Sequence, residues 1–425
     1  MEQYWNKTIE TISRDELAAI QLERLQSTVK WAYENNDYYQ NKMNASEIIP
    51  ADIRSLDDMR ILPFIDKEDF RLAYPLKMLC VDKNDLREMH MSSGSTGSPV
   101  VMAYTQEDLD QWAECMSRCY LMAGLVPGDT IQITPSFGLF NGGFGFYHGA
   151  RKAGMFIIPA GAGNTPRQIN LINDFQVKGL MGVVSYGIRI MEVLQEMNAQ
   201  IPSLKIGIFG AETFSQSMKT KMQDGLGIEA FDIYGMTETG GVGTTGMDCS
   251  CHCGIHVWED QYIVEIIDPI THEPVEDGLE GEIVFTSLTR KAIPVIRFRT
   301  GDLTKVISKT KCACGRTSLR IDQITGRIDD MIIIKGVNFF PRQVEQALME
   351  IPGVHSHYQI IIKEVDGVRD VCINVEAEEG ITGYVVEKHL KEKLGFSPKG
   401  DVFKPGTLPR QEGKAVRVFY EKPGK

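Results

Sequence analysis

The chain has 425 residues, a formal net charge of −12 and 43% apolar residues. This length exceeds what one hydrophobic core usually organises, so two domains are expected. Nucleic acids and anionic membranes attract clustered lysine and arginine, and the negative charge therefore argues against both as main partners. The sequence shows no basic leader followed by an apolar run, and no stretch long enough to span a bilayer, which favours a cytoplasmic protein acting on small molecules.

The first predicted elements are helices over residues 8–44, where helix-forming residues place apolar side chains at helical spacing. From about residue 130 the pattern changes to short apolar or β-branched runs beginning at 131, 154, 179, 205 and 229. The segments between these runs favour helices. This alternation predicts a mainly parallel sheet with helices on both faces, and ligands usually bind at the strand ends of such sheets.

The rest of the chain predicts two smaller units. Shorter alternating runs past residue 255 indicate a β-rich subdomain that closes the first domain. After residues 326–330, the segment 341–351 predicts an amphipathic helix, and alternating strands follow it. We therefore expect an α/β fold with a large N-terminal domain, residues 1–326, that contains mainly parallel sheet layers and the β-rich subdomain. A small α+β C-terminal domain, residues 327–425, would follow.

Five short motifs place polar side chains where a nucleotide can be held. The loop SSGSTGSP at 92–99 offers hydroxyls and glycine amides to a polyphosphate, although it lacks the Gly-Lys-Ser/Thr ending of a Walker A loop. YGMTET at 234–239 follows the last predicted parallel strand and offers a carboxylate to a nucleotide and its magnesium ion. Asp302, in Thr-Gly-Asp at another predicted strand end, suits two ribose hydroxyls. The last two motifs are GRIDD at 326–330 and the Gly-Lys pair at 413–414.

Each motif alone also fits an ordinary role as a turn, a strand exit or a surface lysine. Together and in this order, the five resemble the phosphate loop, magnesium motif, ribose aspartate, hinge and mobile lysine of the adenylate-forming superfamily. Within it the chain is most similar to phenylacetate-CoA ligases along nearly its whole length, as in FGLFNGGFGFYHGA at 137–150 and DDMIIIKGVNFFPRQVE at 329–345. One departure is Val100, where many superfamily members carry a lysine.

The resemblance implies roles for the matching residues. The ATP phosphates would be held by Ser93, Gly94, Ser95, Thr96 and Gly97. The nucleotide and Mg²⁺ would be bound by Tyr234, Gly235, Met236, Thr237 and Glu238, with Glu238 as the magnesium ligand and Glu212 flanking the nucleotide. Asp302 would anchor the ribose, Arg327 would reach phosphate or ribose, and Asp329 would be the hinge pivot. Lys414 would neutralise charge as the carboxylate attacks the α-phosphorus.

The implied reaction converts a carboxylate and ATP to acyl-AMP and pyrophosphate, after which the C-terminal domain rotates and coenzyme A takes the acyl group. Candidates for the acyl pocket lie in a glycine-flanked aromatic turn that leaves room for a flat ring: Phe137, Phe140, Asn141, Gly142 and Gly143. Phe137 and Phe140 fit a plain core role equally well. The expected substrate is phenylacetate or a related aryl acid, and the resemblance also suggests a homodimer.

Two alternative functions fit the same motifs. The first is an adenylating enzyme that acts on another aromatic acid or loads a carrier-protein thiol. The second is a nucleotide-binding sensor that has lost catalysis, which would be expected to have lost Lys414, Glu238 or Asp302; all three are present.

Five of the nine cysteines fall in two short windows, CSCHCGIH at 249–256 and CACG at 312–315. A Cys-x-Cys pair joined to a distant Cys/His pair supplies the four ligands that zinc prefers, although the spacing differs from that of zinc ribbons and free thiols are the alternative. Similar ligases carry a matching set, which implies a structural zinc ion held by Cys249, His256, Cys312 and Cys314. Cys251 or Cys253 could replace Cys249.

Overall fold

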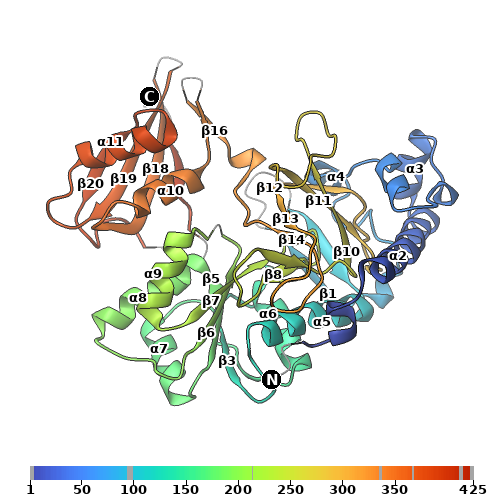
Figure 1. The fold of residues 1–425 in the computed structure, drawn as a ribbon, viewed down its shortest axis with the longest axis horizontal. Helices are drawn as coiled ribbons and strands as arrows, with labels where there is room; N and C mark the ends of the chain where they lie inside the picture. The colour runs from blue at the N-terminus through green and yellow to red at the C-terminus, as the bar shows by residue number, and fades with distance from the viewer. Residues whose placement is uncertain are drawn as a thin grey trace.

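The computed structural model describes residues 4–92, 99–212, 214–334, 337–365, 368–410 and 415–421. Within these ranges the largest sheet has nine strands in the order β13-β14-β9-β8-β7-β6-β5-β3-β4 (Figure 1). Its strands are β3 (Thr130–Ile133), β4 (Phe156–Ile158), β5 (Gly179–Val183), β6 (Ile206–Gly210), β7 (Glu229–Tyr234), β8 (Gly246–Asp248), β9 (Ile255–Val257), β13 (Val306–Ser308) and β14 (Arg320–Ile321). The pairs from β4 to β7 are parallel, and those from β7 to β13 are antiparallel.

Helices cover both faces of the parallel part of this sheet. They are α5 (Gln106–Met122), α6 (Gly142–Lys152), α7 (Thr165–Asp174), α8 (Val184–Glu196) and α9 (Gln216–Leu226). Because side chains alternate along a strand, Ile208 of β6 joins the cluster with α5 and α6, whereas its neighbour Phe209 joins the cluster with α7, α8 and α9. The predicted α/β fold is confirmed.

One sequence expectation about the β-rich subdomain is wrong. The run beginning at residue 256 starts in β9, which belongs to the nine-stranded sheet and not to the subdomain. The reason is that β8 and β9 form a hairpin that returns antiparallel beside β7 and so stays in its plane. The subdomain sheet consists of β10 (Tyr262–Ile267), β11 (Gly281–Ser287), β12 (Phe298–Thr304) and β15 (Gly326–Arg327).

The N-terminal part is helical, as predicted. It contains α1 (Lys7–Glu10), α2 (Arg14–Asn35), α3 (Asp37–Ala45), α4 (Lys67–Leu72), the short helices η1 (Pro50–Asp52), η2 (Asp57–Ile61) and η3 (Lys83–Asp85), and the paired strands β1 (Glu88–Met91) and β2 (Val101–Tyr104). A capping box between Ser13 and Glu16 fixes the start of α2. Among the described residues, no helix is long and apolar enough to cross a membrane.

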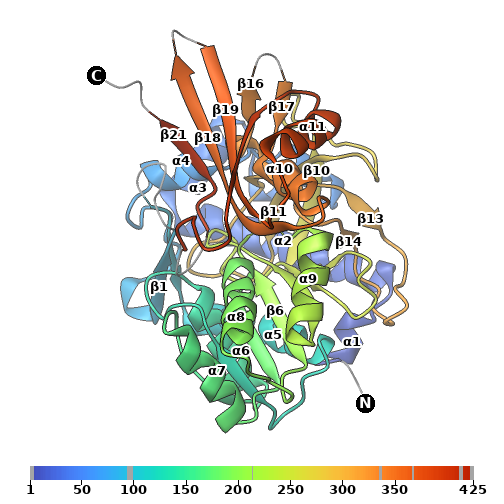
Figure 2. The same cartoon turned by 90° about the vertical axis from the view of Figure 1, so that its left-hand side faces the viewer.

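The C-terminal part has its own hydrophobic core. Its elements are η4 (Ile328–Asp330), β16 (Ile332–Ile334), β17 (Val337–Phe339), α10 (Pro341–Met349), β18 (Val354–Val365), β19 (Val368–Ala377), α11 (Gly383–Leu394), β20 (Lys399–Phe403) and β21 (Val418–Glu421). The apolar face predicted for 341–351 is buried in this core. The two views show this part resting against α8 and α9 (Figures 1 and 2). We propose the boundary between residues 326 and 327, within β15 and shortly before Ile332, where the chain enters this separate core.

Candidate active site and metal centre

Three predicted nucleotide residues meet in one hydrogen-bonded group between the two large sheets. Tyr234 ends β7, Asp302 lies in β12, and Arg327 in β15 is the register partner of Asp302. The Tyr234 hydroxyl donates to Oδ2 of Asp302 at 2.7 Å, and the Arg327 guanidinium donates to Oδ1 at 2.5 Å. Arg327 also bonds the carboxylate of Asp329 at 3.0 Å. The ribose, adenine and hinge candidates therefore form a continuous chain of contacts.

The sequence had suggested that Asp302 lies at a strand end, but it lies inside β12. Gly301 has a φ of +77°, and the pairing between β11 and β12 shifts register in this region. Glycine adopts this backbone conformation easily, so the strand bulges and continues to Thr304. The bulge turns Asp302 toward Tyr234 while β12 remains paired.

Burial governs the electrostatics of this group. Asp302 is 4% exposed, and burial raises the pKa of its carboxyl although the nearby Arg327 cation acts in the opposite direction. Burial likewise raises the pKa of Tyr234 far above its ordinary value, so its hydroxyl stays protonated and remains a hydrogen-bond donor. A buried acceptor pair of this kind suits the recognition of vicinal hydroxyls.

The loop after β7 carries Glu238, the predicted magnesium ligand. Glu238 is 4% exposed, and burial raises the pKa of its carboxyl, while the charge of Lys67 at the start of α4 lowers it. The Tyr262 hydroxyl donates to the Thr239 carbonyl and helps to fix the loop. Lys67 also acts electrostatically on Asp302, so the site contains a cation that the motifs did not indicate. No sequence signal marks Lys67, because it comes from the distant helical part of the chain.

The acyl-pocket candidates adjoin the same loop. Asn141 donates from Nδ2 to the Thr237 hydroxyl at 2.9 Å and accepts from the Val242 amide at 3.1 Å. Gly143 is buried, and a Cβ there would lie 2.6 Å from the Ser136 carbonyl oxygen.

The neighbouring aromatic and glycine candidates differ in exposure. Gly142 begins α6, and a Cβ added there would lie 3.3 Å from the Cβ of Pro135. Phe137 is half-buried and meets Phe144 edge-to-face at 5.5 Å, whereas Phe140 is 51% exposed. Phe140 therefore packs less tightly than Phe137.

The phosphate-loop residues Ser93, Gly94, Ser95, Thr96 and Gly97 and the predicted catalytic residue Lys414 lie outside the described residues. The flanks of the phosphate loop are described. Ser92 and Val100 exchange hydrogen bonds of 2.9 Å, and Met91 donates to the Leu139 carbonyl at 2.9 Å. The base of the phosphate loop is thus joined to the turn that carries the acyl candidates.

Glu212 follows β6, after Ala211, which has a φ of +65°. Its carboxylate accepts from the amide and hydroxyl of Ser185, at 2.6 and 3.0 Å, and from the amide of Ala415 at 2.6 Å. Left-handed backbone at a non-glycine residue costs about 1–2 kcal/mol and often marks a functional position. Glu212 therefore links the carboxyl end of β6 to the residue after Lys414, a contact that its motif did not predict.

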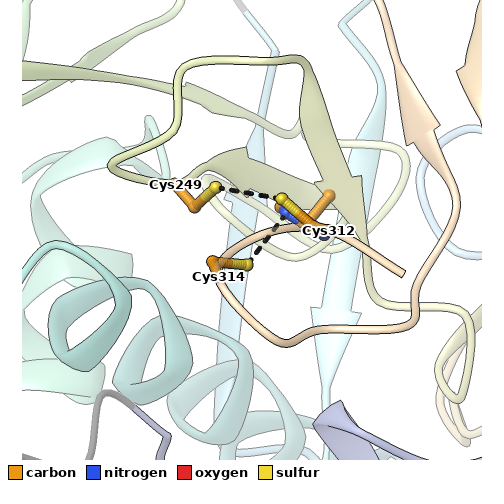
Figure 3. A group of neighbouring side chains, drawn as sticks. Cys249, Cys312 and Cys314 are labelled. Carbon is orange, nitrogen blue, oxygen red and sulfur yellow. Dashed lines mark hydrogen bonds between the residues drawn. The ribbon is translucent and has the colours of Figure 1, made fainter. Parts of the chain in front are cut away.

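The four predicted metal ligands converge in the described part of the chain. The donor atoms of Cys249, His256, Cys312 and Cys314 all lie within 4.8 Å of one another. Figure 3 shows the three sulfurs turned toward a common centre, with Cys249 on one loop and the other two on a second loop. The sulfurs of Cys249 and Cys312 are 3.8 Å apart, and Cys314 Sγ is 3.5 Å from His256 Nε2. A tetrahedral zinc ion requires about 3.8 Å between sulfurs and about 3.6 Å between sulfur and nitrogen.

Surrounding contacts fit a closed metal site. His256 Nδ1 lies 2.9 Å from the Ser318 hydroxyl, which leaves Nε2 directed at the cysteines. Cys251 is exposed and outside the group, while Cys253 Sγ lies 3.6 Å from Cys312 Sγ and accepts from Arg320 at 2.7 Å. The geometry favours Cys249 over both alternates as the fourth ligand.

The sequence profile described as AMP-binding enzyme matches residues 8–289, and the profile described as AMP-binding enzyme C-terminal domain matches residues 336–422. The chain therefore belongs to the AMP-binding enzyme family, and the adenylate-forming resemblance expected from the five motifs is confirmed. It is 39% identical to the phenylacetate-coenzyme A ligase of Escherichia coli K12, over 97% of this chain and 96% of that protein. It is 40% identical to the ligase of the same name from Aromatoleum evansii, over 98% and 97%.

Solved structures of a 2-hydroxyisobutyryl-CoA ligase share the fold of this chain, and they represent different states of that ligase. Its postadenylation-state structure with R3-HIB-AMP has a TM-score of 0.92 to this chain at 26% identity, covering 99% of this chain and 93% of that one. Its thioesterification-state structure with 2-HIB-AMP and CoA scores 0.75 at 27% identity over the same shares. The arrangement of this chain therefore matches the postadenylation state of that ligase.

Proposed function

We propose that this chain is an AMP-forming phenylacetate-CoA ligase. It joins phenylacetate or a related aryl acid to ATP, giving acyl-AMP and pyrophosphate, and then transfers the acyl group to the thiol of coenzyme A. The observation that carries the proposal is the near-full-length similarity to phenylacetate-coenzyme A ligases, with all five motifs retained in order. The joined contacts of Tyr234, Asp302 and Arg327 support it, because they offer a buried acceptor pair to a ribose.

Within this proposal the chain's own residues bind the nucleotide, orient the aryl acid and neutralise the phosphate charge. Asp302 anchors the ribose, Tyr234 lies against the adenine, and Glu238 holds Mg²⁺, which neutralises the polyphosphate. Lys414 supplies a positioned cation where negative charge develops in the adenylation step. Asn141 and Gly143 shape the turn that meets the aryl ring, because Asn141 bonds the loop after β7 and the missing side chain of Gly143 lets the backbone pass close to the Ser136 carbonyl oxygen.

The first experiment measures AMP and acyl-CoA formation over a panel of acids: phenylacetate, 4-hydroxyphenylacetate, indole-3-acetate and 2-aminobenzoate. We expect AMP and CoA thioester in equal amounts, with the highest kcat/KM for phenylacetate. AMP without any CoA thioester would favour loading of a carrier-protein thiol, and a higher kcat/KM for another acid would move the substrate assignment. ATP binding with no AMP from any acid would favour the sensor alternative.

The second experiment separates the two half-reactions. Lys414→Ala should abolish acyl-AMP formation and largely spare thioester formation from chemically prepared phenylacetyl-AMP, since the lysine acts on the phosphate chemistry alone. Lys404→Ala is a matched control, because Lys404 is an exposed lysine of the same domain. Equal loss of both half-reactions in Lys414→Ala would contradict the assigned role.

We also propose a structural zinc ion held by Cys249, His256, Cys312 and Cys314. The fit of the sulfur and nitrogen distances to tetrahedral zinc supports it. With all four positions filled by protein, the ion would pin two loops and leave no open position for catalysis. Elemental analysis of purified protein should give one zinc per chain, and His256→Ala should reduce that ratio.

Three further expectations, on assembly, location and partners, remain proposals. A homodimer rests on the family resemblance, and light scattering would test it. A cytoplasmic location is proposed on the same resemblance, and cell fractionation would test it. The net charge of −12 supports small molecules, not nucleic acids or membranes, as partners.

A further inference from the structure

A hydrogen bond and an ion pair formed by Glu192 join the two parts of the chain. Glu192 lies on α8, and its Oε1 is 2.6 Å from His357 Nε2 on β18. Its Oε2 is 4.0 Å from Nε of Arg410, which comes four residues before Lys414. Arg410 is itself fixed by two hydrogen bonds, of 2.9 and 2.8 Å, to the fully buried Glu376. We refer to Glu192, His357 and Arg410 as the interdomain latch.

The latch is shielded, unlike an ordinary surface ion pair. The side chains of Glu192 and His357 are 19% and 16% exposed, and the hydrogen bond from His357 helps to lower the pKa of Glu192 despite the opposing effect of burial. One turn further along α8, Glu196 pairs with Arg189 at 3.2 Å but is 62% exposed. Exposed pairs contribute little, whereas shielded hydrogen bonds to a charged group are substantially stronger.

A cleft between α8 and the C-terminal part is lined by Ser185, Arg189, His357, Arg410 and Ala415. Beside it, the Ala415 amide donates to Glu212. The residues on either side of 411–414 are therefore both held against the N-terminal part, one through Glu192 and the other through Glu212.

These contacts belong to one domain arrangement. The chain matches the postadenylation structure of the 2-hydroxyisobutyryl-CoA ligase far better than its thioesterification structure, with equal coverage of both. Rotation of the C-terminal part would carry His357 and Arg410 away from α8. We infer that Glu192, His357 and Arg410 form a positioning latch that holds the C-terminal part against α8 for adenylation and is released before thioester formation.

The inference rests on the proposed function for its kinetic consequence. Losing a hydrogen bond to a charged group should slow adenylation roughly 10- to 100-fold. Thioester formation from prepared phenylacetyl-AMP should be unchanged or faster, because that step no longer requires the latch to open. A merely structural role for Glu192 would lower both half-reactions together.

The kinetic test compares Glu192→Ala with Glu196→Ala, a matched control on the same helix that removes an ion pair of Arg189 without touching the C-terminal part. Glu192→Ala and His357→Ala should each slow adenylation selectively, and the double variant should be no slower than either single one. Glu196→Ala should match the wild type. Equal loss of both half-reactions, or losses that multiply in the double variant, would overturn the latch.

A second measurement is independent of the chemistry. Hydrogen–deuterium exchange on the ligand-free protein should be faster in Glu192→Ala than in the wild type, over α8 and the first half of β18, with Glu196→Ala unchanged. Exchange equal to that of the wild type would refute the latch even if the enzyme were active. If exchange is faster in Glu192→Ala than in the wild type, but the wild type makes no AMP from any acid, the proposed function fails while the latch stands.

Discussion

Replacing Asp302 by asparagine removes one negative charge from the centre of the candidate nucleotide site with little change of shape. In the native protein each carboxylate oxygen has its own donor, the Tyr234 hydroxyl at 2.7 Å and the Arg327 guanidinium at 2.5 Å. Asparagine retains one acceptor oxygen, but its amide nitrogen would face a second donor. The amide can bond Tyr234 only by donating to the phenolic oxygen, so the native donor–acceptor pattern and the ion pair with Arg327 are both lost.

The expected magnitude follows from those contacts. A hydrogen bond to a charged group contributes about 1.5–3 kcal/mol, so kcat/KM for ATP should fall roughly 10- to 150-fold. Folding stability should behave differently. Burial raises the pKa of Asp302 in the folded protein, which means that its contribution to stability falls as the pH rises from the ordinary carboxyl pKa through that raised value. The asparagine variant escapes this cost, so its stability at neutral pH should be equal to or higher than that of the wild type.

Steady-state kinetics with varied ATP and urea unfolding of the same preparation measure the two effects. Asp322→Asn is a suitable control, because Asp322 is a partly exposed aspartate whose side chain pairs with Lys305 at 3.7 Å, away from this group. Unchanged kcat/KM for ATP in Asp302→Asn, or a lower urea midpoint with normal kinetics, would show that Asp302 is structural and not a nucleotide ligand.

Two further predictions concern stability. A zinc ion that joins Cys249 to Cys312 closes a loop of about 60 residues and should contribute about 4 kcal/mol to the free energy of unfolding. His256→Ala or zinc chelation should therefore lower the melting temperature by about 5 °C. An unchanged melting temperature after metal loss would refute a structural role. Burial and the charge of Asp248 raise the pKa of Asp232 to about 7, so the contribution of Asp232 to stability should decrease as the pH rises from about 4 to about 7. Asp232→Asn should remove this decrease and be up to about 4 kcal/mol more stable at pH 8, as measured by urea midpoints at several pH values; parallel profiles for the two proteins would contradict it.

The sequence predicted those features that depend on local pattern. The parallel strands through β7 and the amphipathic helix α10 follow from apolar periodicity, and the structure confirms both. The family followed from the resemblance of five motifs in order, because residues that must meet one nucleotide leave fixed residue types in each motif. The cysteine windows likewise predicted the group that the structure brings together.

Other features required the folded chain. Lys67 acts on Glu238 and Asp302 although some 170 residues or more separate them in sequence, and no local pattern signals that approach. The bulge at Gly301 places Asp302 inside a strand, which depends on pairing with β11. Glu212 and Glu192 each have one partner in the other part of the chain, Ala415 and His357, and these two contacts arise only when the two parts meet.

The sequence by itself thus determined the family and the reaction type, through a resemblance carried by residue types in short motifs, and it predicted a role for each motif. Only the tertiary structure decided which oxygen of Asp302 meets which donor, which cysteine and histidine side chains lie close together, and how Arg410 and Ala415 contact the N-terminal part. The physical reason is that hydrogen bonds and ion pairs operate over a few ångströms, and such distances between remote residues are set by packing and not by local sequence.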